Sequence, residues 1–278
     1  MDIGIVGLGL IGGSMAKSIK ARTPYRVWGS DINSEVAAAA SLCGAIDAPL
    51  TDENIASCDL ILTAILPGAT VEWVRTEGAR ISPDTILIDL CGVKRAVHSE
   101  VQAVAARYGF TYMGGHPMAG KEKWGFAHSS ESLFDGAFMI LTPGENARLS
   151  LLEELKTFFT RIGFAGLTIT TPEEHDKIIA YTSQLAHIVS SAYVKSPEAQ
   201  RRRGFSAGSY RDLTRVARLD PEMWAELMAG NADFLGGQLE LLMENLGEYL
   251  AALRNGDREK LHMLLEEGCR MKMQAGGN

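Results

Sequence analysis

The sequence predicts an α/β fold in which a doubly wound parallel sheet is followed by an all-helical second domain. Short apolar runs typical of buried strands alternate with helical patterns through residues 1–169. Beyond this point strand signals stop, and amphipathic helical patterns continue to the C-terminus. We therefore expect two domains, residues 1–169 and 170–278. Because helices this apolar usually bury surface against a second copy, the helical domain is expected to form a homodimer.

The expected strands are short, mostly apolar runs bounded by turn-forming residues. They are residues 3–6, 25–29, 60–65, 85–89, 110–113 and 137–141. Parallel strands end at one edge of their sheet, so the segments that follow these strands should converge there. Doubly wound proteins bind their ligands at that edge.

Composition excludes several classes of function. The chain of 278 residues is 46% hydrophobic, enough for a sizeable core, and its net charge of −7 offers no basic face for nucleic acid. No apolar stretch approaches the ~18 residues of a membrane span, and no signal peptide is expected, so the cytoplasm is the expected location. The cysteines show no metal-binding spacing, which favours reduced thiols and no metal site. They are Cys43, Cys58, Cys91 and Cys269.

The pattern G-x-G-x-x-G stands between the first expected strand and the first expected helix. Gly7 would make the turn, Gly9 would let the backbone approach a pyrophosphate, and Gly12 would let helix and strand pack closely. The N–H groups at the helix start, at Leu10 and Ile11, would face the phosphates. This context predicts a Rossmann-type dinucleotide-binding domain.

The second expected strand runs into Asp31, about twenty residues after the glycine pattern. A carboxylate there can accept hydrogen bonds from the adenosine ribose and would repel a 2′-phosphate. This favours NAD over NADP as the cofactor. The alternative is that Asp31 only caps the helix expected to begin near Asn33.

One histidine, His116, lies between glycines and a proline just after the strand expected at 110–113. The pattern predicts a side chain held on a rigid loop at a strand end, where α/β proteins place their chemistry, although a lone histidine can also be structural. Cys91 ends the preceding strand. As a nucleophile it would need a base or a positive field, and only Lys94 is near. A small packing residue beside the nicotinamide is the preferred interpretation.

The second half holds three further candidates. His187 lies inside an expected helix among apolar neighbours, where a buried core histidine is the simple interpretation. Arg211 and Arg215 are one helical turn apart and could hold a dianionic substrate through bidentate contacts. They could equally form a solvated face paired to Asp212, which the residues alone favour.

Three stretches, residues 7–12, 115–122 and 210–215, resemble the prephenate/arogenate dehydrogenases of tyrosine biosynthesis. The resemblance extends over nearly the whole chain in matching order and spacing. It implies oxidation of prephenate by NAD with loss of carbon dioxide, giving 4-hydroxyphenylpyruvate. It also implies that His116 accepts the proton of the ring hydroxyl, a task suited to imidazole, and that His187 contacts the substrate.

The resemblance assigns the charged residues as well. Arg215 stands at the family's carboxylate-binding position and would hold the substrate with help from Arg211. Glu122 and Asp176 would join Arg215 in an ionic gate over the pocket, with Asp176 supplied by this chain or by the partner subunit.

Two departures from the family pattern are visible. The family has a glycine-serine pair after the strand-ending aspartate, and its serine bonds the substrate hydroxyl near the nicotinamide. Cys91 and Gly92 stand there instead, still beside the expected cofactor. The family's Ser-His-Leu-Pro-His motif reads Ser-Gln-Leu-Ala-His at residues 183–187.

Several alternatives stay open at this point. Arogenate, or both compounds as for a cyclohexadienyl dehydrogenase, could replace prephenate, although retention of His187 favours prephenate. A β-hydroxyacid dehydrogenase would need a lysine in a glycine-rich helix of the second domain, which the sequence lacks. The missing serine also allows a non-catalytic NAD-sensing protein.

Overall fold

The computed structural model describes residues 1–144 and 147–276. By compactness the chain divides into two units, Met1–Asn231 and Ala232–Asn278. The first unit contains the sheet, and the second is a pair of helices.

Across residues 1–144 and 147–276, the sheet of the first unit has eight strands in the order β3-β2-β1-β4-β5-β6-β7-β8. Neighbouring strands are parallel except for β6 and β7. The strands are β1 (Asp2–Val6), β2 (Arg26–Ser30), β3 (Ala48–Pro49), β4 (Leu60–Thr63), β5 (Ile86–Asp89), β6 (Thr111–Pro117), β7 (Phe138–Pro143) and β8 (Gly166–Ile169). The predicted doubly wound α/β fold class is confirmed, while β3 and β8 carry no signal that the sequence analysis recognised.

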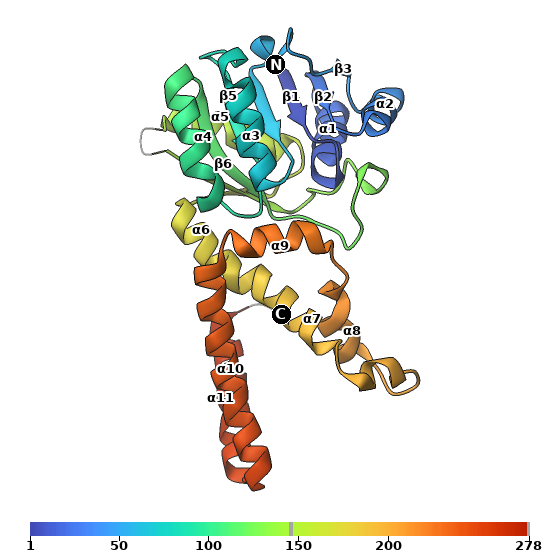
Figure 1. Cartoon of the computed structure of the whole chain (residues 1–278), viewed down its shortest axis with the longest axis vertical. Helices are drawn as coiled ribbons and strands as arrows, with labels where there is room; N and C mark the ends of the chain where they lie inside the picture. The colour runs from blue at the N-terminus through green and yellow to red at the C-terminus, as the bar shows by residue number, and fades with distance from the viewer. Residues whose placement is uncertain (145–146, 277–278) are drawn as a thin grey trace. The chain divides into compact units, whose positions relative to one another are not determined.

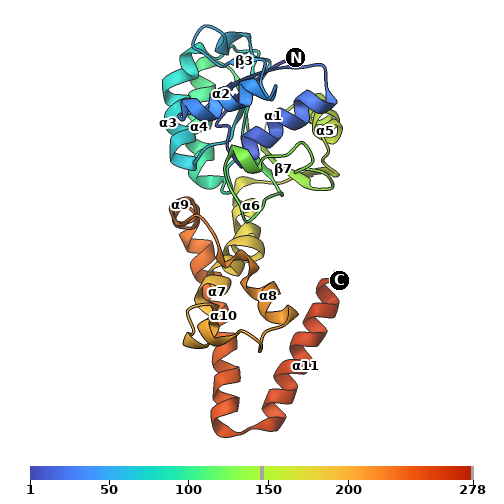
Figure 2. The ribbon, with the colours of Figure 1, turned by 90° about the vertical axis from the view of Figure 1, so that its right-hand side faces the viewer.

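Helices cover both faces of this sheet, as Figures 1 and 2 show. They are α1 (Leu10–Arg22), α2 (Ser34–Leu42), α3 (Pro67–Glu77), α4 (Arg95–Tyr108) and α5 (Leu149–Arg161), with short 3₁₀ turns η1 (Ile55–Ser57), η2 (Gly78–Arg80) and η3 (Phe126–His128). Successive strand residues point to opposite faces, so Ile61 joins the core under α3 and α4, whereas Leu62 joins the core under α1 and α5. The sheet is therefore buried on both sides, as parallel sheets require.

Strand β7 corrects one expectation, that all strands end at the same edge. It runs antiparallel to β6, with Met113 opposite Pro143 and Pro117 opposite Met139. The pairing also extends β6 through His116, which therefore lies in a strand rather than on the expected loop. A Cβ at Gly115 would lie 2.6 Å from the Ile88 side chain, so only glycine allows this close approach.

A helical segment completes the first unit. It comprises α6 (Pro172–Ile179), the π-helical turn η4 (Ala180–Leu185), α7 (Ala186–Tyr193), η5 (Pro197–Arg201), α8 (Gly208–Thr214), η6 (Arg215–Ala217) and α9 (Pro221–Ala229). Helix α6 begins with a capped first turn, because the Thr171 side chain accepts the Glu174 N–H and Pro172 occupies the first position. π-Helical turns inside helices often mark functional sites.

The second unit is a hairpin of α10 (Ala232–Asn255) and α11 (Arg258–Ala275). Gly256 makes the turn with a φ of +65°, and Asp257 caps α11. In Figure 2 the two helices diverge from this turn. Large apolar side chains along the hairpin are exposed, namely Leu241, Met243, Leu246, Leu250, Leu253, Met263, Leu265, Met271 and Met273. Across the described residues, no helix combines the length and apolar character needed to cross a membrane.

The expected domain boundary at residues 169 and 170 remains a prediction. Secondary structure changes there from sheet to helix, since every described element after β8 is helical. Compactness nevertheless groups α6 to α9 with the sheet.

Candidate active site

A buried ion pair holds the ends of β5 and β6 together. The Lys94 ammonium contacts the Asp89 carboxylate and donates to the Gly115 carbonyl at 2.5 Å. Asp89 also accepts a hydrogen bond from the Tyr112 hydroxyl at 2.8 Å. Both charged side chains are fully buried, and a buried pair persists only when hydrogen bonds satisfy it in this way. The pair therefore fixes the backbone next to His116.

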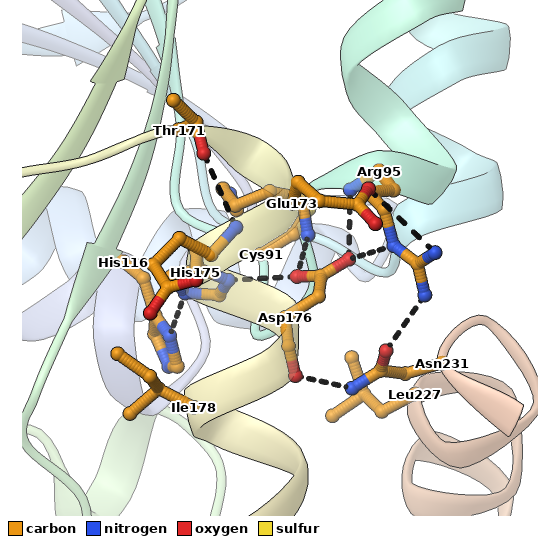
Figure 3. A network of polar contacts seen from close by, with 12 residues as sticks. Cys91, Arg95, His116, Thr171, Glu173, His175, Asp176, Ile178, Leu227 and Asn231 are labelled. Atoms are coloured by element: carbon orange, nitrogen blue, oxygen red, sulfur yellow. Dashed lines mark hydrogen bonds and ion pairs between the residues drawn. The ribbon is translucent and has the colours of Figure 1, made fainter. Parts of the chain in front are cut away.

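The ring of His116 is the first member of a chain of polar groups, drawn in Figure 3. Its Nδ1 lies 2.9 Å from Nε2 of His175, and Nδ1 of His175 lies 2.7 Å from Oδ1 of Asp176. His116 keeps partial solvent access, whereas His175 and Asp176 are buried. The chain thus leads from an accessible imidazole to a buried carboxylate.

Asp176 also joins α6 to the start of α4. Its carboxylate accepts the backbone N–H groups of Lys94 and Arg95, at 2.8 and 2.9 Å, and Nε of Arg95 at 3.3 Å. The first N–H groups of a helix lack intrahelical partners and favour a negative charge. Asp176, on α6, accepts hydrogen bonds from these N–H groups and places a negative charge at the start of α4.

Burial and hydrogen bonding set the charge states of His116, His175 and Asp176. It lowers the pKa of His116 well below the usual imidazole range, helped by the neighbouring His175 and by the Lys94 charge. Burial also lowers the pKa of His175, although its bond to Asp176 opposes the shift. Burial acts to raise the Asp176 pKa, but the bonds from His175, Arg95 and Lys94 hold it below its usual value. At neutral pH both rings are neutral and Asp176 is ionised.

A second network links Asp176 and Arg95 to Asn231, which follows α9, and to Gln184. The Asn231 amide donates to the Asp176 carbonyl and to Oε1 of Gln184, both at 2.8 Å, and its oxygen accepts from Arg95 at 3.0 Å. Gln184 in turn donates to the Leu227 carbonyl at 3.1 Å. Gln184, one of the departures from the family motif, therefore has a defined contact here.

Gly92 lies beside the other nitrogen of His116. A Cβ at this position would be 3.9 Å from Nε2 of His116 and 3.4 Å from the Leu227 side chain. A serine here would therefore place its hydroxyl near that nitrogen. Within the described part of the chain, His175 is the side chain that hydrogen-bonds the His116 ring.

Cys91 is a buried packing residue. Its sulfur lies 3.5 Å from the Thr70 hydroxyl and 3.6 Å from the Ile65 carbonyl. Burial, reinforced by the Asp89 charge, raises the pKa of the thiol far above its usual value. A thiol that resists ionisation is a poor nucleophile, so the structure opposes that alternative.

The glycine loop leads directly into α1. Gly7 has a φ of +86°, and a Cβ at Gly12 would lie 1.8 Å from the Gly7 carbonyl oxygen, so protein packing requires both glycines. At Gly9 the φ is −67° and a Cβ would meet no protein atom within 4 Å. Packing does not explain Gly9, but open space before a helix N-terminus is what a pyrophosphate needs.

Asp31 lies between this loop and the end of β2. Its two carboxylate oxygens accept the N–H groups of Leu8 at 2.8 Å and of Asn33 at 2.9 Å. The cap of α2 is Asn33, which accepts the Glu35 N–H. The alternative interpretation of Asp31 as the helix cap is therefore wrong.

His187 projects from α7 towards η6. Its Nδ1 donates to the Val216 carbonyl at 3.0 Å, because a carbonyl can only accept, and its ring centroid is 3.8 Å from that of Trp224. Burial lowers the pKa of His187, with the Arg215 charge acting in the same direction. His187 is therefore a neutral ring held close to the segment that carries Arg215.

Arg215 pairs with Glu122, in the loop that follows β6, at 2.5 Å. Both side chains are exposed, so this pair lies at the surface. Arg211 is more exposed still and pairs with Asp212 at 3.5 Å, as the solvated-face interpretation expected. Helix α8 ends at Thr214, so the two arginines do not continue one α-helical face.

The expected place of Asp176 in the ionic gate is wrong. Its carboxylate is fully buried and bonded to His175, Lys94 and Arg95, and not to Glu122 or Arg215. A second copy of the chain would bury its own Asp176 in the same way. The gate therefore reduces to the pair of Glu122 and Arg215.

His175 and Lys94 are the important groups whose roles the sequence analysis missed. The threonine, proline and acids at residues 171–174 are typical of a helix start, which by itself gives His175 no role. Helical spacing could have indicated that the two side chains are buried. His175 lies four residues before Ile179, and Asp176 lies four residues before Ala180, so each pair shares one face of the helix, and this face is buried. A histidine and an aspartate on an apolar face need polar partners.

Two family models match the chain. Residues 15–165 match the nucleotide-binding domain of prephenate dehydrogenase, and residues 171–267 match its dimerization domain. The prephenate dehydrogenase of Bacillus subtilis (strain 168) is 32% identical over 268 residues, covering 92% of this chain and 71% of that relative. The cyclohexadienyl dehydrogenase of Zymomonas mobilis is 28% identical over 269 residues, which cover 93% of this chain and 90% of that relative.

Solved structures show the same similarity. Prephenate dehydrogenase from Aquifex aeolicus, in complex with hydroxyphenyl propionate and NAD+, superimposes with a TM-score of 0.85 at 26% identity. The match covers 99% of this chain and 98% of that chain.

Four histidines that are partly or fully buried lead us to expect that the protein loses stability as the pH falls. Burial lowers the pKa values of His98, His116, His175 and His187, so these rings stay neutral in the folded state while unfolded imidazoles gain protons below about 6.5. The stability that these neutral rings contribute is fully present above about pH 6.5 and is lost as the pH falls below that value. Each ring that remains neutral should lower the free energy of unfolding by about 1 kcal/mol between pH 7 and 5.5.

Chemical denaturation at the two pH values measures this effect. His98→Phe removes one such ring outside the site and should reduce the loss. His262→Gln, at an exposed position, should leave it unchanged. Equal unfolding free energies of the wild-type protein at both pH values would contradict the expectation.

Proposed function

The chain belongs to the prephenate dehydrogenase family, and from this premise we propose that it is an NAD-dependent prephenate dehydrogenase. It would oxidise the ring hydroxyl of prephenate and release carbon dioxide, giving 4-hydroxyphenylpyruvate. The observation that carries the proposal is the neutral, partly accessible imidazole of His116 at the ligand-binding edge of the sheet. A proton acceptor must be uncharged, and this one stays so at neutral pH.

The residues of the glycine loop fit the cofactor. The N–H groups of Leu10 and Ile11 begin α1, and the space at Gly9 is open for a pyrophosphate. Asp31 ends β2 where an adenosine ribose would lie, and its negative charge disfavours a 2′-phosphate. When bound, NAD supplies the hydride acceptor. A family relative of known structure binds NAD+, which agrees with this assignment.

His116 would accept the proton of the substrate hydroxyl at Nε2, the nitrogen that faces Gly92. As hydride leaves the same carbon, the hydroxyl becomes a carbonyl. The bond to the ring carboxylate then breaks and carbon dioxide leaves. The electron pair of that bond makes the ring aromatic, and the former carbonyl oxygen takes back the proton held by His116 to become the phenol hydroxyl. Aromatisation supplies much of the driving force, so the chain's contribution is mainly proton transfer and positioning.

Arg215 would hold a substrate carboxylate, because a guanidinium can bind it in a bidentate manner. In this proposal the Glu122 pair keeps Arg215 in place over the site until substrate arrives, and Arg211 assists from the surface. His187 would contact the substrate through Nε2, since its Nδ1 is engaged with Val216.

The substrate assignment has one rival. The Bacillus subtilis relative is named a prephenate dehydrogenase, whereas the Zymomonas mobilis relative is named a cyclohexadienyl dehydrogenase. Retention of His187 supports prephenate. Use of both prephenate and arogenate is the second candidate, supported by the Zymomonas mobilis relative.

We also propose that the protein acts as a homodimer in the cytoplasm, divided functionally at residues 169 and 170. The match to a dimerization domain and the exposed leucines and methionines of the α10–α11 hairpin support the dimer. Cysteines that are all unpaired suit a reducing compartment. The family models fall on either side of the proposed division.

The activity predicts formation of NADH from prephenate and NAD. His116→Asn should lower kcat by about 10²–10⁴-fold with little change in the NAD Kd, since the amide cannot take the proton. Absorbance at the NADH band measures turnover, with NADP and arogenate run beside the main reaction. No wild-type turnover with either substrate would contradict the proposal, and so would undiminished turnover of His116→Asn.

The Arg215 assignment predicts a specific loss of substrate affinity. Arg215→Gln should raise the substrate KM by about 10–100-fold, the value of a charge-assisted contact, and leave the NAD KM unchanged. Glu122→Gln should change the substrate KM less and weaken its salt dependence. Arg201→Gln, an exposed arginine elsewhere on the surface, is the control. An unaltered substrate KM in Arg215→Gln would remove Arg215 from the site.

If the α10–α11 hairpin forms the dimer interface, charged substitutions on its apolar side chains should separate the subunits. Leu250→Lys together with Leu253→Lys should shift the molar mass in light scattering from dimer towards monomer, because exposed apolar area no longer pairs. Glu259→Lys adds the same charge at an exposed polar position and should leave the mass unchanged. A monomeric wild-type protein at micromolar concentration would contradict the dimer.

A further inference from the structure

We propose that His175 and Asp176 are positioning residues that fix the tautomer of His116, so that Nδ1 carries the ring proton and Nε2 is the free acceptor. The inference rests on the proposed function at one point, namely that Nε2 receives the substrate hydroxyl proton. The direction of the hydrogen bonds follows from the contacts of Asp176 and from the neutral state of the two rings.

The first step starts at the carboxylate. Asp176 is ionised and can only accept hydrogen bonds, and its other partners, two backbone N–H groups and the Arg95 guanidinium, all donate. Nδ1 of His175, 2.7 Å from Oδ1, must therefore carry a proton. The carboxylate thus selects one tautomer of His175.

The second step passes to the next ring. A neutral imidazole has one N–H, so Nε2 of His175 is unprotonated and accepts. The group facing it at 2.9 Å is Nδ1 of His116, which must donate. His116 is neutral as well, so its single proton is on Nδ1. Nε2 of His116 is left with a free lone pair.

The third step concerns where this lone pair is directed. Nε2 faces Gly92, which has no side chain, and the space is bordered by Leu227. No side chain within the described residues hydrogen-bonds this nitrogen. Among the described residues, the hydrogen bond to the His116 ring is made at Nδ1, which leaves Nε2 available to a substrate hydroxyl.

Charges around the two rings explain why the contact also matters once a proton is accepted. The Lys94 ammonium, at the start of α4, opposes a positive charge on either ring, while Asp89 on β5 partly balances it. Arg95 faces Asp176 and Glu173 on α6. After proton transfer, the Nδ1–H of His116 still points to His175, whose other nitrogen donates to a carboxylate. The Asp176 charge therefore stabilises the imidazolium through His175.

The first test requires no substrate. Side-chain ¹H–¹⁵N correlation spectra at neutral pH distinguish the two tautomers of each of the six histidines, and the signals of His116 are those that His116→Asn removes. We expect a protonated Nδ1 and an unprotonated Nε2. His175→Leu should remove the preference and give a mixture, whereas His175→Gln, whose amide oxygen can accept the same hydrogen bond, should restore it. Protonated Nε2 in the wild-type protein would overturn the inference.

The second test is kinetic. His175→Leu should lower kcat by about 10²-fold and leave the KM for NAD unchanged, and His175→Gln should recover most of the loss. A residue that only supports the fold would lower stability in both variants without this rescue. His262→Gln, exposed on the second unit, is the matched control. Full turnover in His175→Leu would overturn the positioning role.

The two tests separate this inference from the proposed function. If the wild-type protein oxidises neither prephenate nor arogenate, the function fails, yet the spectra still decide the tautomer. If His175→Leu does not fold, the wild-type spectrum and His175→Gln decide it.

Discussion

The arrangement of the site depends on the carboxylate of Asp176. It accepts the first N–H groups of α4 and Nδ1 of His175, so one side chain sets both a helix start and a ring orientation. Each of these donors would be buried without a partner if the carboxylate were removed, and such groups are expensive to leave unpaired. Lys94 begins α4 and reaches back to the Gly115 carbonyl, so the same carboxylate indirectly supports the strand that carries His116.

The sheet was largely predictable because its signals are local. Buried strands are short apolar runs, and a glycine pattern between strand and helix defines the first turn. The direction in which a strand runs relative to its neighbour is not determined by the residues of that strand alone. Nothing in residues 138–143 shows that β7 runs against β6, and this pairing is what makes Gly115 and His116 part of a strand. The two-residue strand β3 is too short to produce a periodic signal.

The site was predictable only in part, for a related reason. His116 was found because glycines and a proline surround it in the sequence. His175 carries no such local mark, and its importance comes from a contact with a residue 59 positions away. Asp176 was assigned to the surface gate by resemblance, but its neighbours are the buried N–H groups at the start of α4. Arg211 and Arg215 were expected on one helical face, which requires the α-helix to continue past Thr214.

Gly92 shows how a position without a side chain can leave His116, the proposed proton acceptor, oriented. A hydroxyl at position 92 would lie near Nε2 of His116, on the side from which the proposed substrate would approach. The bond to His175 holds the opposite nitrogen instead, and burial keeps both rings neutral until a proton arrives. A low pKa makes the free ring a weak base, but prephenate, the proposed substrate, carries two carboxylates and would add negative charge nearby, which favours the imidazolium. In the proposed reaction, the bound substrate would therefore raise the basicity of His116, while the contact with His175 sets the orientation of the ring.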